Sequence, residues 1–67
     1  MSIAKVIEVT AQSEKGFEDA IREGIARTGE TLSNVQSAWI KDQDVQIQEG
    51  KITAYRVTMK VTFVVSS

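Results

Sequence analysis

Residues 13–28, SEKGFEDAIREGIART, carry a single apolar stripe at the spacing of one helix face. Charged side chains fill most of the remaining circumference, and six residues form the stripe: Phe17, Ala20, Ile21, Gly24, Ile25 and Thr28. This pattern predicts an amphipathic helix from Ser13 to Thr28, and the remaining segments are organised around it as a sheet. Ser13 is suited to cap the first turn, Glu14 adds negative charge at the positive end of the helix dipole, and Gly29 is suited to end the helix.

The polar side of this predicted helix pairs opposite charges one turn apart. In water each such pair stabilises a helix by about 0.2–0.5 kcal/mol. The three pairs are Lys15 with Asp19, Glu18 with Arg22, and Glu23 with Arg27. We interpret these charges as a solvated face, with a contact between subunits as the alternative.

The chain has 67 residues, which is enough for one domain, residues 1–67, and too few for a second. A core of this size seldom supplies more than about 3 to 5 kcal/mol unless a further link stabilises it. Cysteine and histidine are both absent, which excludes disulfides, thiolate zinc sites and imidazole-based catalysis. Oligomerisation or a cation bound by carboxylates remains as the stabilising link.

The charge and hydropathy patterns argue against nucleic-acid and membrane partners. Net charge is −1, and the eight basic residues are scattered rather than clustered. The first residues, MSIAKVIEV, lack the features of a signal peptide, and no segment approaches about 18 consecutive apolar residues. We expect a soluble, cytoplasmic protein that binds neither nucleic acid nor membranes.

Three segments have the composition and alternation of strands. They are residues 3–10, residues 35–48 and residues 52–65. The second segment is one long strand or a strand bent between Lys41 and Asp44. Its odd positions are mostly apolar, so the alternation predicts that Ser37 and Trp39 lie on the face that covers the helix.

The register of the hairpin between the last two strands depends on whether odd-numbered residues of one strand oppose odd-numbered or even-numbered residues of the other. A two-residue turn, Glu49-Gly50, opposes odd to even positions and sets Trp39 against Lys60. A loop one residue longer, which includes Lys51, opposes odd to odd positions and keeps both apolar rows on one face. We predict the three-residue loop, with Gly50 at a positive φ.

The predicted class is α+β with the order β-α-β-β, a three-stranded antiparallel sheet curled over one helix. Such a sheet has unpaired edges and a polar second face. Because monomeric proteins have to protect exposed sheet edges, we expect this chain to assemble further.

No group of residues in the sequence supports an enzyme. General acid-base chemistry requires a histidine or a tuned pair of carboxylates in a pocket, and a chain of three strands and one helix hardly encloses a pocket.

Trp39, considered alone, is interpreted as a core or interface residue, with a stacking platform for a flat ligand as the alternative. Asp42 and Asp44 lie on one strand face if the strand is regular. Their oxygens suit calcium or magnesium, but two carboxylates are too few without waters or neighbouring chains.

Several motifs taken together resemble the dodecin family. They are V-I-E-V, the helix start S-E-x-x-F, A-I-x-x-G-I-A-R-T on the helix, T-L-S-N-V, D-Q-D, and G-K-I-T-x-Y-R-V-x-x-K-V-x-F. The resemblance spans nearly the whole chain. It implies a small β-α-β-β protein whose sheet partly wraps the helix and whose twelve copies form a hollow shell. That shell is the stabilising link that the short chain requires.

The resemblance also bears on ligands. Dodecins bind flavins such as riboflavin or flavin mononucleotide as stacked pairs between two tryptophans, with a glutamine of the third strand contacting the ring. The resemblance places Ser37 at the tryptophan position and Arg56 at the glutamine position. Trp39 lies about 6 to 7 Å further along the same strand face, as a displaced platform or as simple packing, which we favour. The sequence is closer to the non-flavin branch called calcium dodecin, which implies a role for a divalent cation.

Three hypotheses for the function follow. The first is a non-catalytic homododecameric shell that stores or buffers a small ligand or a cation such as calcium or magnesium, with Asp42 and Asp44 as metal ligands. The second is a flavin-binding dodecin with an altered site that contains Ser37, Trp39 and Arg56. The third is an assembly or partner-binding module that carries no small ligand.

Overall fold

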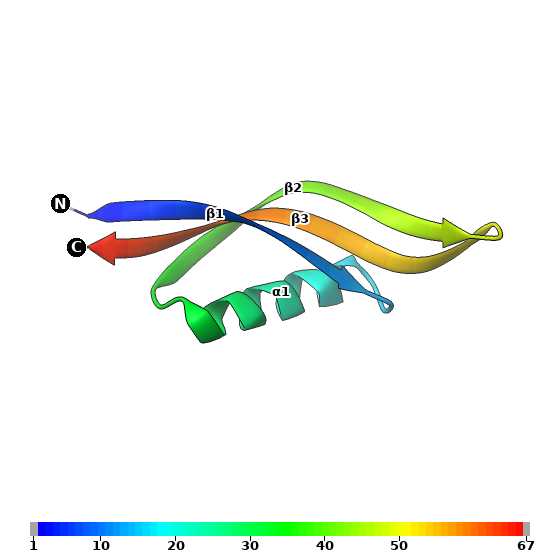
Figure 1. Cartoon of the computed structure of the whole chain (residues 1–67), viewed down its shortest axis with the longest axis horizontal. Helices are drawn as coiled ribbons and strands as arrows, with labels where there is room; N and C mark the ends of the chain where they lie inside the picture. The colour runs from blue at the N-terminus through cyan, green and yellow to red at the C-terminus, as the bar shows by residue number, and fades with distance from the viewer. Residues whose placement is uncertain (1, 67) are drawn as a thin grey trace.

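The computed structural model describes residues 2–66 and has four elements in the order β-α-β-β (Figure 1). Their bounds are β1 Ile3–Ser13, α1 Phe17–Thr31, β2 Val35–Gln48 and β3 Lys51–Ser66. The strands form one antiparallel sheet in the order β1-β3-β2, so β3 is central. The predicted α+β class with this element order is confirmed. Within residues 2–66, no helix has the length and apolar character needed to cross a membrane.

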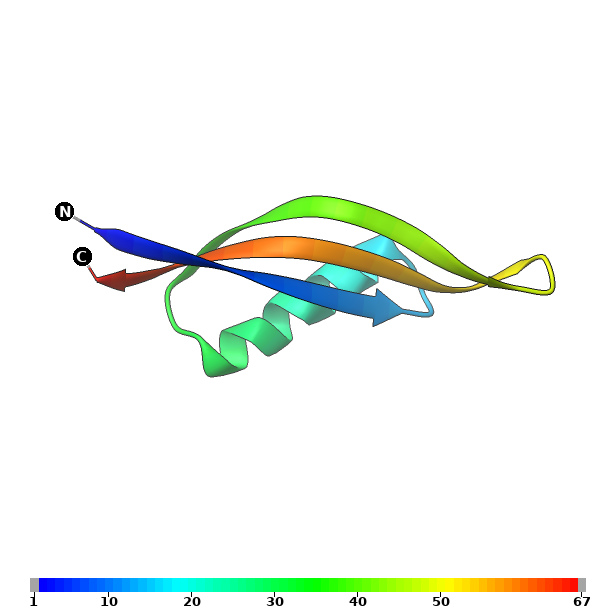
Figure 2. The same ribbon diagram turned by 45° about the horizontal axis from the view of Figure 1, so that its top comes forward.

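The core lies between α1 and the face of β3 that turns toward it. Val57, Met59 and Val61 are fully buried there, at the odd positions that the alternation predicted. Ala20 is buried against them from the helix stripe, whereas Ile25 at the edge of the stripe is 36% exposed. The strands curve across one side of α1 and extend beyond both of its ends (Figure 2). The helix has 15 residues in a molecule 52 Å long, so it covers only the middle of the sheet.

The helix begins later than predicted, and the predicted N-cap at Ser13 is wrong. Ser13 is the last residue of β1 and pairs with Tyr55 of β3. Its hydroxyl accepts a hydrogen bond from the Lys15 backbone N–H at 2.9 Å and donates one to the Asp19 carboxylate at 2.6 Å. Gly16 occupies the N-cap position without a side-chain hydrogen bond. Ser13 therefore shapes the turn that leads into the helix instead of capping it.

The helix also ends later than predicted. Gly29 lies inside α1, which continues to Thr31, so the predicted stop is wrong. The Leu32 N–H donates to the Thr28 carbonyl at 3.0 Å, which closes the last turn beyond the glycine. Tertiary packing of the helix stripe thus outweighs the weak helix propensity of one glycine.

The charged side of α1 holds fewer ion pairs than the spacing predicted. Glu18 and Arg22 form one at 2.6 Å, with both side chains more than 70% exposed. Within residues 2–66 the other two predicted pairs do not form ion pairs, and Asp19 bonds to the Ser13 hydroxyl instead. Because exposed pairs contribute little to stability, this charged side adds little to the fold.

The β2–β3 hairpin turns through two residues, so the predicted three-residue loop is wrong. Gln48 pairs with Lys51, which leaves Glu49 and Gly50 in the turn at φ 53° and 76°. Positive φ at both central residues is the type I′ geometry, whose twist matches that of the flanking strands. The predicted positive φ at Gly50 is confirmed.

Irregular pairing with β3 decides which side chains of β2 face the helix. One shift in register falls just after Val35 and another just after Ile40. Between these shifts, Ala38 and Ile40 pack on the core, whereas Trp39 lies on the opposite face. The prediction that Ser37 and Trp39 face the helix is wrong, because each bulge inserts an unpaired residue and reverses the alternation.

Gly24 permits the close approach of α1 to the sheet. A Cβ at this position meets Met59 Cε at 2.6 Å and Ala11 Cβ at 2.9 Å. We expect Gly24→Ala to lower the free energy of unfolding by about 1 to 3 kcal/mol, because the core must shift to admit a methyl group. In the matched control, Gly29→Ala, a Cβ meets nothing within 4 Å. Helix propensity should raise the stability of that variant by about 0.8–1 kcal/mol. Urea denaturation measures both variants, and a stabilising effect of both would contradict the close contact.

Candidate ligand-binding face of the sheet

The five residues singled out from the sequence lie on one face of the sheet, the side opposite α1, here called the outer face. Cross-strand pairing fixes this placement, because each candidate on β2 opposes an even-numbered residue of β3, away from the core. The pairs are Ser37 with Thr62, Trp39 with Lys60, Asp42 with Thr58, and Asp44 with Arg56. On the same face β1 contributes Val6, Glu8, Thr10 and Gln12. The outer face is therefore mostly polar and spans all three strands.

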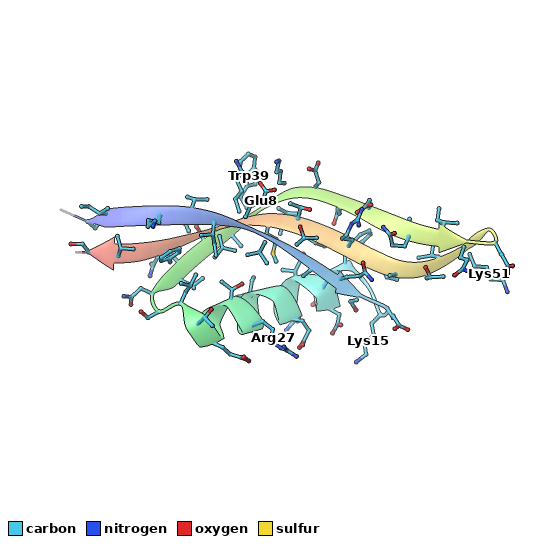
Figure 3. All side chains as sticks on the ribbon, in the orientation of Figure 1. Glu8, Lys15, Arg27, Trp39 and Lys51 are labelled. Atoms are coloured by element: carbon cyan, nitrogen blue, oxygen red, sulfur yellow. The ribbon has the colours of Figure 1, made fainter. Side chains whose placement is uncertain are left out.

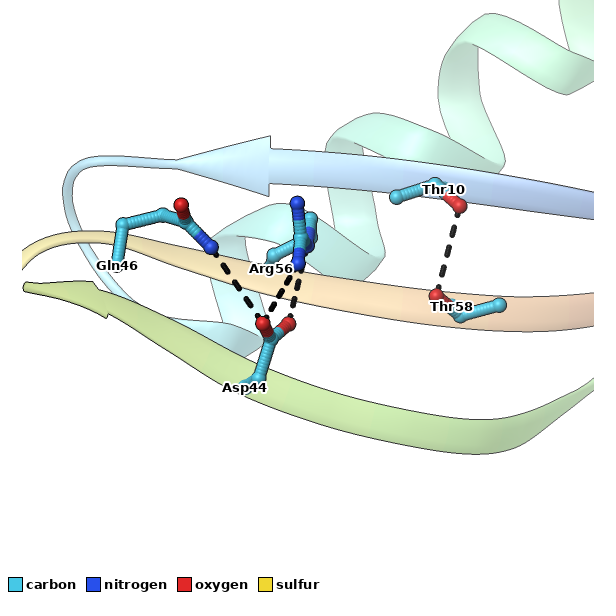
Figure 4. A network of polar contacts seen from close by, with 5 residues as sticks. All are labelled: Thr10, Asp44, Gln46, Arg56 and Thr58. Atoms are coloured by element: carbon cyan, nitrogen blue, oxygen red, sulfur yellow. Dashed lines mark hydrogen bonds and ion pairs between the residues drawn. The ribbon is translucent and has the colours of Figure 1, made fainter.

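Arg56 and Asp44 form an ion pair with two hydrogen bonds between β3 and β2 (Figure 4). Arg56 Nε donates to Asp44 Oδ1 at 3.0 Å, and Nη2 donates to Oδ2 at 2.7 Å. The Gln46 amide donates to the same carboxylate at 3.4 Å. The hydrogen bonding of Arg56 to Asp44 and the negative charge of Asp44 raise the pKa of Arg56. The Asp44 carboxylate thus already accepts three hydrogen bonds from its own chain.

Trp39 projects from the outer face and is 62% exposed (Figure 3). Lys60 Nζ lies 5.6 Å from the centroid of the indole ring, within the range of a cation–π contact. Lys41 Nζ donates to the Glu8 carboxylate at 3.3 Å, and Glu8 projects from the same side of the sheet. The indole therefore does not pack into the core of its own chain, and a prediction of core packing for Trp39 is wrong. Its ring is available to a ligand or to a second copy.

The structure joins some of the candidate residues and separates others. Asp42 and Asp44 share the outer face, but Asp44 is bonded to Arg56. No cluster of three or more side chains that could hold a metal occurs within residues 2–66. Trp39 pairs with Lys60, which is four residues from Arg56 along β3, a spacing of about 13 Å. The backbone positions of Trp39 and Arg56 are therefore well separated along the sheet.

Sequence reasoning missed two contacts of the outer face, Glu8 with Lys41 and Trp39 with Lys60. The first depends on the irregular pairing after Ile40 and on β3 lying between the two edge strands. The second had a signal in the sequence, because a two-residue turn sets Trp39 against Lys60. That turn is the one the hairpin adopts.

Comparison with known proteins identifies the family. The family model described as Dodecin matches residues 3–66. The chain belongs to the dodecin family. The calcium dodecin of Mycobacterium tuberculosis is 33% identical over 64 residues, which cover 94% of this chain and 89% of that relative. The resemblance drawn from the sequence motifs is therefore confirmed.

Solved dodecin structures share the fold over nearly the whole chain. The dodecin from Streptomyces davaonensis has a TM-score of 0.92 at 32% identity, covering 98% of this chain and 97% of its own. A mutant of Thermus thermophilus dodecin has a TM-score of 0.93 at 28% identity, covering 100% of both chains. The Mycobacterium tuberculosis calcium dodecin, described as calcium chelating with a novel calcium-binding site, has a TM-score of 0.83 at 30% identity. It covers 92% of this chain and 89% of its own.

Proposed function

We propose that this dodecin forms a non-catalytic homododecameric shell that binds a small ligand or a divalent cation on the outer face, for storage or buffering. The observation that carries the proposal is the gathering of the five candidate residues on one face of the sheet. Membership of the dodecin family supports a role in binding small ligands. The cytoplasmic location expected from the sequence belongs to the same proposal.

The small core of the single chain supports assembly. Among residues 2–66, four residues form its fully buried hydrophobic cluster: Ala20, Val57, Met59 and Val61. Large apolar side chains stay exposed within residues 2–66, namely Ile3, Val6, Ile25, Trp39, Ile47, Ile52 and Val65. A chain of this size with so much exposed apolar surface gains stability by burying that surface against further copies.

Calcium is the first candidate ligand, and the similarity to a calcium dodecin supports it. Asp42 is exposed and forms no ion pair within residues 2–66, so its carboxylate is free to bind a cation. Asp44 is already paired with Arg56, which competes with a cation for the Asp44 carboxylate. Because calcium takes six to eight oxygen ligands, the residues of one chain fit it only in part. Water or carboxylates of neighbouring copies would complete the site.

Removal of divalent cations should lower the melting temperature of the protein. Added calcium or magnesium should restore the melting temperature, by an amount that grows with ion concentration. The corresponding gain in the free energy of unfolding reaches about 2.7 kcal/mol at an ion concentration one hundred times Kd. Differential scanning calorimetry with chelator, and then with graded calcium, measures this shift. A melting temperature indifferent to chelator would mean that the two aspartates are merely solvated or paired.

The variant that combines Asp42→Asn with Asp44→Asn should abolish the ion dependence while the shell stays assembled. The substitutions remove both the cation ligands and the repulsion between carboxylates. A charge-matched control combines Glu14→Gln with Glu30→Gln, two exposed acids away from the outer face. That control should keep the full response to calcium. An equal loss of response in both double variants would indicate a general charge effect instead of a site.

Flavin is the second candidate ligand, favoured by the exposed ring of Trp39 on the outer face. Ser37 and Arg56 stand where the resemblance places the stacking tryptophan and the ring-contacting glutamine of flavin-binding dodecins. Arg56 already donates from Nε and Nη2 to Asp44, so this ion pair competes with a contact between its guanidinium and a ring edge. We therefore expect flavin to bind weakly, through Trp39 alone.

A further inference from the structure

The ion pair between Arg56 and Asp44 occupies a carboxylate that a cation on the outer face would use. Each oxygen of Asp44 accepts from the guanidinium, Oδ1 from Nε at 3.0 Å and Oδ2 from Nη2 at 2.7 Å. The Arg56 side chain is 42% exposed and the Asp44 side chain is 52% exposed. Because an ion pair exposed to this degree is held only weakly, a dissolved divalent cation can compete with Arg56 for the carboxylate.

The surroundings of Arg56 offer little else to balance its charge. Its neighbour on β1 is Gln12, which is neutral, and the neutral Gln46 amide donates to Asp44 from the other side. The nearest further acid on β2 is Asp42, one row along the sheet, and the same cation would engage it. A guanidinium loosened from Asp44 by a cation would therefore turn its donors toward solvent.

The charges of this part of the outer face favour an anion once a divalent cation has bound. Two carboxylates, Asp42 and Asp44, and the Arg56 guanidinium together carry a net negative charge, which a divalent cation reverses to a net positive charge. The next charged groups, Glu8 and Lys41, pair with each other and add no net charge. Since like charges close together repel, an anion at Arg56 would stabilise the cation beside it.

Arg56 also has the geometry to hold an oxyanion. A guanidinium presents its N–H donors in a rigid fork that matches two oxygens of a carboxylate, sulfate or phosphate group. Arg56 already holds the Asp44 carboxylate in this way, through two donors (Figure 4). An oxyanion that replaces Asp44 takes over the same two donors. The exchange therefore costs Arg56 little of its hydrogen bonding.

We propose that a divalent cation and an oxyanion bind this part of the outer face together, the cation at Asp42 and Asp44 and the oxyanion at Arg56. Arg56 competes with a cation that binds alone, and it holds the anion when both ions are present. The inference rests on the proposed cation site and names its second ligand. Coupling between two ligands is reciprocal, so each ion must raise the affinity for the other by the same factor.

Calorimetric titration of the wild-type protein with calcium chloride tests the coupling. The background salt is either sodium sulfate or sodium chloride at equal ionic strength, and free calcium is corrected for its own complex with sulfate. We expect the Kd for calcium to be about fivefold lower, or lower still, in sulfate. Titration with sodium sulfate, with and without saturating calcium, should give the same factor. Equal calcium affinities in the two salts would overturn the inference.

Two substitutions separate the charge of Arg56 from its fork of donors. Arg56→Gln removes both the competitor and the anion ligand, so calcium should bind more tightly in chloride and sulfate should no longer change its Kd. Arg56→Lys keeps the charge without the fork, so calcium should still bind weakly in chloride and the effect of sulfate should fall below that of the wild type. The matched control is Arg22→Gln, which breaks the exposed ion pair with Glu18 on α1. It should leave both affinities unchanged.

The outcomes separate this inference from the proposed function. A wild-type protein that binds calcium equally well in both salts overturns the coupling and leaves the cation site in place. A wild-type protein that binds no calcium in either salt overturns both. Sulfate that still tightens calcium binding in Arg56→Gln would place the anion at another residue and would also overturn the inference.

Discussion

Diluted to sub-micromolar concentration, the protein should unfold as it dissociates. Within residues 2–66 the single chain has a four-residue buried cluster and seven exposed large apolar side chains, so in the proposed shell contacts between copies would supply much of its stability. Circular dichroism and light scattering over one dilution series should therefore change at the same concentration. A folded monomer that persists after the large species has disappeared would contradict the expectation.

Coupled dissociation and unfolding also make stability depend on protein concentration. For a dodecamer, each tenfold rise in concentration should raise the apparent free energy of unfolding by about 1 kcal/mol per chain. Gly29→Ala is a useful control here, because it changes α1 at an exposed site away from neighbouring atoms. It should raise every urea midpoint and leave the dependence on concentration unchanged.

Ser37→Trp combined with Arg56→Gln should raise the affinity for riboflavin by about a hundredfold. Stacking on an aromatic ring is worth about 0.5–1.5 kcal/mol beyond the area buried, and a buried polar edge without its partner costs about 1–3 kcal/mol. The two substitutions supply both interactions and free the site from the Arg56–Asp44 ion pair. Quenching of riboflavin fluorescence measures the affinity.

The unmodified protein should be colourless and should quench riboflavin little at micromolar concentrations. Trp39→Ala is the control for the exposed indole. Strong quenching by the unmodified protein that Trp39→Ala abolishes would show that Trp39 is a displaced platform. It would make flavin the ligand of the outer face.

The helix and β3 could be predicted because their signals are long and repeated. The stripe of α1 recurs over several turns, and the alternation of β3 places Val57, Met59 and Val61 in the core, where the structure has them. Element ends were less predictable. Ser13 has the side chain of an N-cap, but its place in β1 opposite Tyr55 and its bond to Asp19 decide its role. Local propensity is too weak to overrule such contacts.

The sequence could not predict which side chains of β2 face the helix, because bulges leave little trace in the hydrophobic pattern. Gln36 and Lys41 have no partner in the pairing with β3, and neither residue type marks a bulge. On the other strand, Thr53 is likewise unpaired. The parity argument for a three-residue loop assumed continuous pairing, which these irregularities break. A two-residue turn and matched apolar rows can therefore coexist.

The outer face was partly predictable. The sequence singled out the residues that lie there, and the expected common face of Asp42 and Asp44 is confirmed. The ion pair between Asp44 and Arg56 depends on the register that the bulges set, so the sequence alone could not show it. What the symmetry of the proposed shell would bring to this face depends on contacts between copies, which a single chain does not contain.

Native mass spectrometry tests the proposed shell most directly, because it reports both the number of subunits and any retained ligand. We expect a species of twelve times the 7.4 kDa chain mass. It should carry additional mass that chelator removes if the ligand is calcium. A monomer at micromolar concentration, or a closed assembly with another number of chains, would contradict the dodecameric shell.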